Sequence, residues 1–149
     1  MIQLIWSLLG VLAGVAIAVQ APINAQLARG LGMPVAAAAG SFSAGAVVLA
    51  AVTFVLARMQ GITLDFRAPA PWLFFAGGCL GAIYVTCTVI LVSRIGAASL
   101  MALAIAGQLI AGMLMDRFAV FGLAGRELTA GRIAGAALLV LGAALVSFA

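Results

Sequence analysis

The sequence concentrates uncharged polar side chains at one end of its first apolar run. Gln20 and Asn24 are four residues apart in "AVQAPINAQLARG", so a helix would carry both amides on one face. Pro22 between them cannot donate a backbone hydrogen bond, which frees a carbonyl oxygen and favours a kink. These groups could line the pathway of a polar solute, with Pro22 as a hinge. They could also form the solvated end of a helix, because Gln26 and Arg29 follow.

Further side chains could bind a solute inside otherwise apolar segments. Gln108 lies in "AIAGQLIAG" beside Gly107, which leaves room for a ligand, although the amide could instead bond a neighbouring helix. Tyr84 is the single tyrosine, and its hydroxyl needs a partner in a core or a cavity. Ser41 and Phe42 in "SFSAG" are weaker pathway candidates, because serines in membrane helices often bond their own backbone.

The chain offers little for catalysis. It contains no histidine and three acidic residues, and its sequence shows neither a nucleophile–base pair nor a phosphate-binding loop. Cys79 and Cys87 are separated by about 12 Å along a helix, too far for a disulfide between them. We expect both as small core residues, and two cysteines without histidine do not predict a metal site. No enzyme activity, cofactor or metal is therefore expected.

The ionisable residues avoid the centres of the apolar runs, as expected when charge at bilayer depth is costly. Asp116 and Arg117 follow the run "AGMLM" directly. They could be a solvated or locally paired helix end, or they could gate a pathway.

Composition places the chain in a membrane. Of its 149 residues, 67% are hydrophobic and 7% are charged, too few charges to cover a soluble domain of this size. Pro34 suits a first helical position, and Thr129 suits an N-cap. The chain is predicted to be one all-α integral membrane domain, residues 1–149. Apolar runs of about 20 residues predict five transmembrane helices, at residues 4–27, 34–57, 71–92, 96–115 and 129–148.

Small residues at a spacing of four predict close packing between helices, because they let two backbones approach in lipid. Gly77 and Gly81 form such a pair in the third predicted helix. Gly10 and Gly14 form another in the first.

The arginines favour one orientation in the membrane. The side of the N-terminus carries Arg58, Arg67, Arg117, Arg126 and Arg132. The opposite side carries Arg29 and Arg94. The positive-inside rule then favours a cytoplasmic N-terminus, by a bias that a few charges would reverse. Because the arginines are spread singly, they form no stripe for nucleic acid.

Several segments together resemble the YdcZ-like family of small bacterial inner-membrane proteins, in the drug/metabolite transporter superfamily. The segments are "QAPINAQLARGLG", "SFSAG", "PWLFFAGGCLGAIYVT" and "GAASLMALAIAGQLIAGMLMDRF". The resemblance implies a five-helix unit equivalent to one half of an inverted-repeat transporter. It places the family's recurring polar positions at Gln20, Asn24, Tyr84, Gln108 and Asp116. The chain departs from the family pattern at Gly112, where a serine is expected, and at Ala119, where a glycine is expected.

The expected function is transport of a small organic solute by alternating access. An antiparallel dimer would hold the site at its midplane, and the partner would be a second copy or an oppositely oriented homologue. Without a buried carboxylate we expect a neutral or weakly polar solute, or facilitated diffusion. Two other functions stay open: a small dual-topology channel, and a non-transporting subunit of a membrane assembly.

Overall fold

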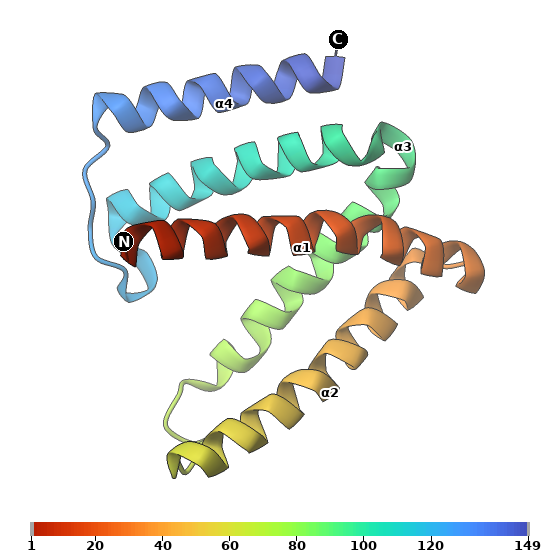
Figure 1. The fold of residues 1–149 in the computed structure, drawn as a ribbon, viewed down its shortest axis with the longest axis vertical. Helices are drawn as coiled ribbons and strands as arrows, with labels where there is room; N and C mark the ends of the chain where they lie inside the picture. Colours follow the sequence, from red (N-terminus) through yellow and green to blue (C-terminus); the bar gives the residue numbers. More distant parts are fainter. Residues whose placement is uncertain (1, 149) are drawn as a thin grey trace. The chain divides into compact units, whose positions relative to one another are not determined.

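Long helices account for almost all of the computed structural model, which describes residues 2–148 and contains no strand within them. The long helices are α1 (Ile2–Leu31), α2 (Pro34–Gln60), α3 (Pro71–Phe118) and α4 (Ala130–Phe148), with a short 3₁₀ turn, η1 (Val120–Gly122), before the last (Figure 1). All four are long and apolar enough to cross a membrane. The predicted class, an all-helical membrane protein, is confirmed.

The count of five helices is not confirmed, because the third and fourth predicted helices form one element. α3 has 48 residues, about 72 Å if it were straight, against a hydrocarbon core of about 30 Å. It is interrupted at Gly96, where φ is 79° and ψ is 165°. The break expected between the predicted helices 71–92 and 96–115 is thus reduced to one residue, in a conformation that essentially only glycine adopts.

Local signals set several helix ends. Met33 precedes α2 with an extended backbone, and Pro34 occupies the first turn as predicted. Gly61 ends α2 with φ at 66°, and its N–H donates to the carbonyl oxygen of Ala57. The predicted cap of α4 is confirmed, because the Thr129 hydroxyl oxygen accepts the backbone N–H of Arg132 at 3.4 Å.

Two of the predicted helices extend further toward the C-terminus than the sequence indicated. The first helix continues past residue 27 to Leu31, and the second continues past residue 57 to Gln60. The apolar run marks only the part of a helix inside the hydrocarbon. The last turns extend beyond it, where Arg29 and Arg58 can keep their charged ends in water.

The chain forms two units, one ending at Ser93 and the other beginning at Arg94. In the first unit α1 and α2 are joined by Gly32 and Met33, pack against each other near this connection and diverge away from it (Figure 1).

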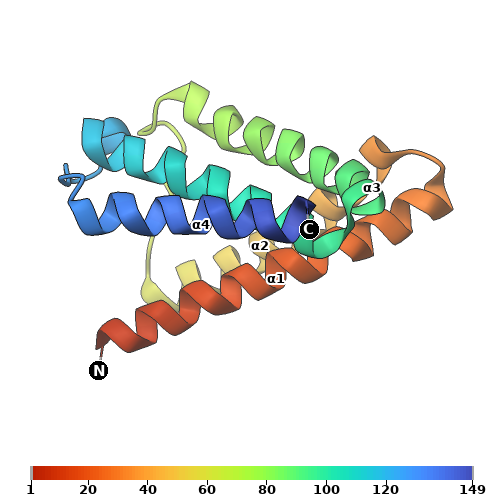
Figure 2. The same ribbon diagram turned by 90° about the horizontal axis from the view of Figure 1, so that it is seen from above.

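In the second unit the end of α3 and α4 run antiparallel (Figure 2). The Ser99 hydroxyl donates to the carbonyl oxygen of Val146 at 3.3 Å, and Asp116 pairs with Arg132 near the other end of the two helices. Two residues connect α1 with α2, a length typical of neighbouring helices in bundles, whereas the longer segment 119–129, which includes η1, connects α3 with α4.

Most large apolar side chains point outward. Leu4, Val11 and Val15 on α1 are each more than half exposed, and no large side chain among residues 2–148 is fully buried. An apolar surface this extensive does not occur on soluble monomers and is suited to lipid. The buried positions are held mainly by alanine and valine, which allow close helix packing.

Candidate functional site

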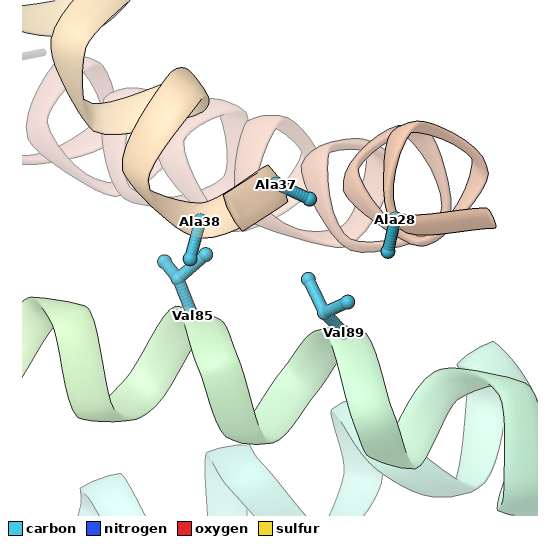
Figure 3. Close-up of a cluster of buried hydrophobic side chains, with 5 residues drawn as sticks. All are labelled: Ala28, Ala37, Ala38, Val85 and Val89. Atoms are coloured by element: carbon cyan, nitrogen blue, oxygen red, sulfur yellow. The ribbon is translucent and has the colours of Figure 1, made fainter. Parts of the chain in front are cut away.

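Three helices of the first unit meet at a cluster of small side chains, which we call the small-residue cluster. Its buried members are Ala28 of α1, Ala37 and Ala38 of α2, and Val85 and Val89 of α3 (Figure 3). On α1 the buried face continues along the helix through Ala25 and Ala21, at the spacing of an amphipathic stripe. Small side chains bring the helix backbones close here, so polar groups nearby are held in a rigid frame.

Asn24 lies on this buried face of α1 and is 4% exposed. Its Nδ2 is buried and has no hydrogen-bond partner. The other buried polar side chain of the first unit is satisfied, because the Thr88 hydroxyl donates to the Val85 carbonyl oxygen at 2.9 Å. A buried donor left without an acceptor costs about 1–3 kcal/mol. The Asn24 amide can therefore still donate a hydrogen bond to an acceptor, such as one on a solute.

The structure separates Asn24 from the second amide of its predicted pair. Gln20 shares the face by spacing but is exposed, one turn further from the start of α2. Pro22 lies inside a helix that continues on to Leu31, and its predicted role as a hinge stays a prediction.

Two predicted aromatic residues lie in the first unit, one against the small-residue cluster and one against Gly81. Tyr84 of α3 is partly buried and packs against the cluster. One turn away on the same helix, Gly81 faces the ring of Phe42, whose Cζ would lie 3.0 Å from a Cβ at that glycine. Ser41, next to Phe42 on α2, is half-buried. The first unit thus contains Asn24 on the buried face of α1, Tyr84 against the small-residue cluster and Phe42 against Gly81.

The other predicted positions have more open surroundings. Nothing described in this chain lies within 4 Å of a Cβ built at Gly77 or Gly107. In the second unit Gln108 is exposed, beside Gly107. Cys79 and Cys87 are exposed on α3, so the expectation that they are core residues was wrong. A thiol is apolar enough to face lipid, and composition alone cannot show which side of a helix is covered.

Asp116, one of the two predicted gating residues, has a partner that the sequence did not reveal. Its carboxylate accepts a charge-assisted hydrogen bond from the guanidinium of Arg132 in the first turn of α4. Arg132 also donates to the Glu127 carbonyl oxygen at 3.3 Å, and the Arg126 N–H donates to the Asp116 carbonyl oxygen at 2.9 Å. Together these contacts tie the α3–α4 connection to the end of α3, while Arg117 is exposed.

One signal could have identified Arg132. A cation in the first turn of a helix and an acid in the last turn both oppose the helix dipole. Asp116 is near the end of α3, and Arg132 is in the first turn of α4. Two residues of opposite charge at unfavourable ends of consecutive helices are a reason to expect an ion pair.

The described residues hold no group of three or more His, Cys, Asp or Glu side chains that could bind a metal ion. The polar features of residues 2–148 are therefore amides, hydroxyls and helix-end charges in an apolar bundle. Such groups can bind and orient a solute by hydrogen bonds.

Comparison with known proteins gives two matches. The family model described as "Putative inner membrane exporter, YdcZ" matches residues 5–145. The chain is also 33% identical over 103 residues to "Inner membrane protein YdcZ" of Escherichia coli (strain K12), covering 69% of this chain and 68% of that protein. No solved structure matches.

Proposed function

Because this chain belongs to the YdcZ family of inner-membrane proteins, we propose that it carries a small organic solute across the bacterial inner membrane by alternating access. The protein is a multi-pass inner-membrane protein of a family described as exporters. The proposal adds the class of solute, the mechanism and the residues that contact the solute.

The observation that carries the proposal is the unpartnered amide of Asn24 beside the small-residue cluster. A membrane protein has no water in its apolar interior to satisfy a buried donor, so such a group is expected to meet a partner during function. Tyr84 packs against the same cluster and supplies a hydroxyl, and Phe42, which lies against Gly81, supplies an aromatic face. We propose that Asn24, Tyr84 and Phe42 contact the solute, with Gln20, Ser41 and Gln108 along its pathway.

The charge distribution favours a neutral or weakly polar solute. The three acidic residues are Asp65, Asp116 and Glu127. None lies at the centre of an apolar helix: Asp116 is near the end of α3, and the other two lie in connections. Proton-coupled exchange of cations commonly uses a carboxylate at the midplane of the membrane. None of these three residues lies at such a position.

We propose that the working form is an antiparallel dimer with its site at the midplane. The 48 residues of α3, interrupted at Gly96, are long enough for two crossings, so the chain would cross five times. An odd number of crossings puts the termini on opposite sides. Two inverted copies then supply the two-fold relationship on which alternating access depends. The partner is a second copy, or a homologue of opposite orientation given the five-to-two arginine bias.

A transport assay with matched amide variants tests the proposal. Proteoliposomes are loaded with a mixture of neutral polyols, monosaccharides and amides, and the solutes retained are measured by mass spectrometry. We expect protein-dependent loss of some solutes, and at least tenfold slower loss with Asn24→Ala. Gln26→Ala, which removes an exposed amide from the same helix, is the control and should behave as wild type.

Three results would contradict the proposal. Stepwise single-molecule currents across a planar bilayer would indicate a channel. An unchanged rate of solute loss in Asn24→Ala would show that Asn24 is not part of the solute site. Strict proton coupling that survives every carboxylate-to-amide variant would contradict the proposed mechanism.

A further inference from the structure

Residues 61–70 form the connection between α2 and α3 (Figure 1). A groove that the proposed transport site does not include lies at this connection and the start of α3. Its volume is about 570 Å³, and it is lined by Phe66, Arg67, Pro69, Pro71, Phe74 and Phe75. We propose that this groove binds one anionic phospholipid, with the lipid phosphate on Arg67 and an acyl chain along the phenylalanine rings. The inference does not depend on the transport function.

The charge of Arg67 is available to a ligand. The nearest acid in the sequence, Asp65, uses its carboxylate to accept the backbone N–H of Arg67 at 2.8 Å, which shapes the turn. Within residues 2–148 the ion pair formed is that of Asp116 with Arg132, so the Arg67 guanidinium has no carboxylate within 4.0 Å. A guanidinium presents paired N–H donors that match the oxygen atoms of a phosphate.

A second arginine belongs to the same connection. Arg58, in the last turn of α2, holds its guanidinium 5.2 Å from the centre of the Phe54 ring. These two residues line a smaller groove of about 340 Å³ together with Gly61, Ile62 and Thr63. Stacking on an aromatic ring orients a guanidinium without neutralising it. With Arg58, Arg67 and Asp65, the residues around the connection have a net charge of +1, which complements an anionic headgroup.

The lining identifies a lipid rather than a soluble anion as the occupant. The rings of Phe66, Phe74 and Phe75 are each at least half exposed beside Arg67. α3 enters its apolar run at Pro71, and Trp72 in its first turn is a residue typical of the membrane interface. An arginine at headgroup depth beside apolar rings suits an amphiphile that has a phosphate and an acyl chain.

A competition experiment tests the site. The purified full-length protein in a neutral detergent is incubated with equimolar phosphatidylglycerol and phosphatidylcholine, and the lipids that remain bound are quantified by mass spectrometry. We expect enrichment of phosphatidylglycerol. Arg67→Gln should reduce that enrichment by about fivefold, the effect typical of one basic residue at an anionic surface. Phe75→Ala should weaken binding of both lipids.

Arg94→Gln is the matched control, because it removes one arginine from the other end of the first α3 segment and leaves the groove unchanged. Equal retention of the two lipids by wild type would overturn the proposal, as would an equal loss in Arg94→Gln. Displacement of the lipid by inorganic phosphate, with no effect of Phe75→Ala, would show a site for soluble anions and would also overturn it. Helical circular dichroism of each variant verifies that the protein is folded.

Discussion

Phe42 of α2 lies against Gly81 of α3 so closely that a Cβ at the glycine would meet the ring at 3.0 Å from Cζ and 3.2 Å from Cε1. Both residues belong to the first unit, and Tyr84 lies one turn further along α3 beside the small-residue cluster. The absence of a side chain at position 81 therefore sets the distance between α2 and α3 where the proposed solute contacts lie.

Gly81→Ala should give a free energy of unfolding about 1 kcal/mol lower than Gly77→Ala does, because the added methyl group meets the Phe42 ring, which must shift by a few tenths of an ångström. Thermal unfolding in detergent measures the change. Gly77→Ala, four residues earlier in open space, should leave stability unchanged or raise it slightly through helix propensity. The double variant Gly81→Ala with Phe42→Ala should recover part of the loss. A loss of the same size in both glycine variants would contradict this contact.

Asp116 and Arg132 should show a coupling energy of about 0.5–1 kcal/mol in a double-mutant cycle of Asp116→Asn and Arg132→Gln. The value is modest because both side chains are about a quarter to a third exposed, and solvent weakens such pairs. Salt should reduce the coupling further. The same cycle with Arg117→Gln in place of Arg132→Gln should give no coupling, since Arg117 takes no part in the pair. Equal coupling in both cycles would mean that net charge, rather than this pair, matters.

Ala119→Gly should raise the free energy of unfolding by about 0.5–1 kcal/mol. Ala119 has φ at 50°, a left-handed conformation that costs a residue with a side chain about 1–2 kcal/mol. Part of the gain is offset because glycine is more flexible in the unfolded chain. This is also the position where the family resemblance implies a glycine. Ala124→Gly, in the same connection without a positive φ, is the control and should be slightly destabilising. A similar effect at both positions would contradict the argument.

Most of the helices could be predicted because their signals are local. A run of apolar residues, Pro34 in a first turn and Thr129 as a cap depend only on neighbours in the sequence. The spacing of Gln20 and Asn24 predicts that both lie on one face of α1. It cannot show that only Asn24 is buried, because burial depends on contacts between elements distant in the sequence. The pairing of Asp116 with Arg132 is likewise a contact between two helices.

The break at Gly96 interrupts α3, and one substitution can test the proposal that the chain reverses direction there. Its φ of 79° and ψ of 165° fall in a region essentially restricted to glycine, so Gly96→Ala should cost about 1–3 kcal/mol or drive the segment into a continuous helix. A continuous α3 could not turn back within the bilayer. We therefore expect Gly96→Ala to move the C-terminus to the other side of the membrane in part of the molecules, as measured by reporters fused to both ends. Gly112→Ala, at a glycine of α3 without a positive φ and with open space around it, should leave the topology unchanged. Unchanged reporter signals in Gly96→Ala, with stability also unchanged, would show that the chain does not depend on a reversal at this residue.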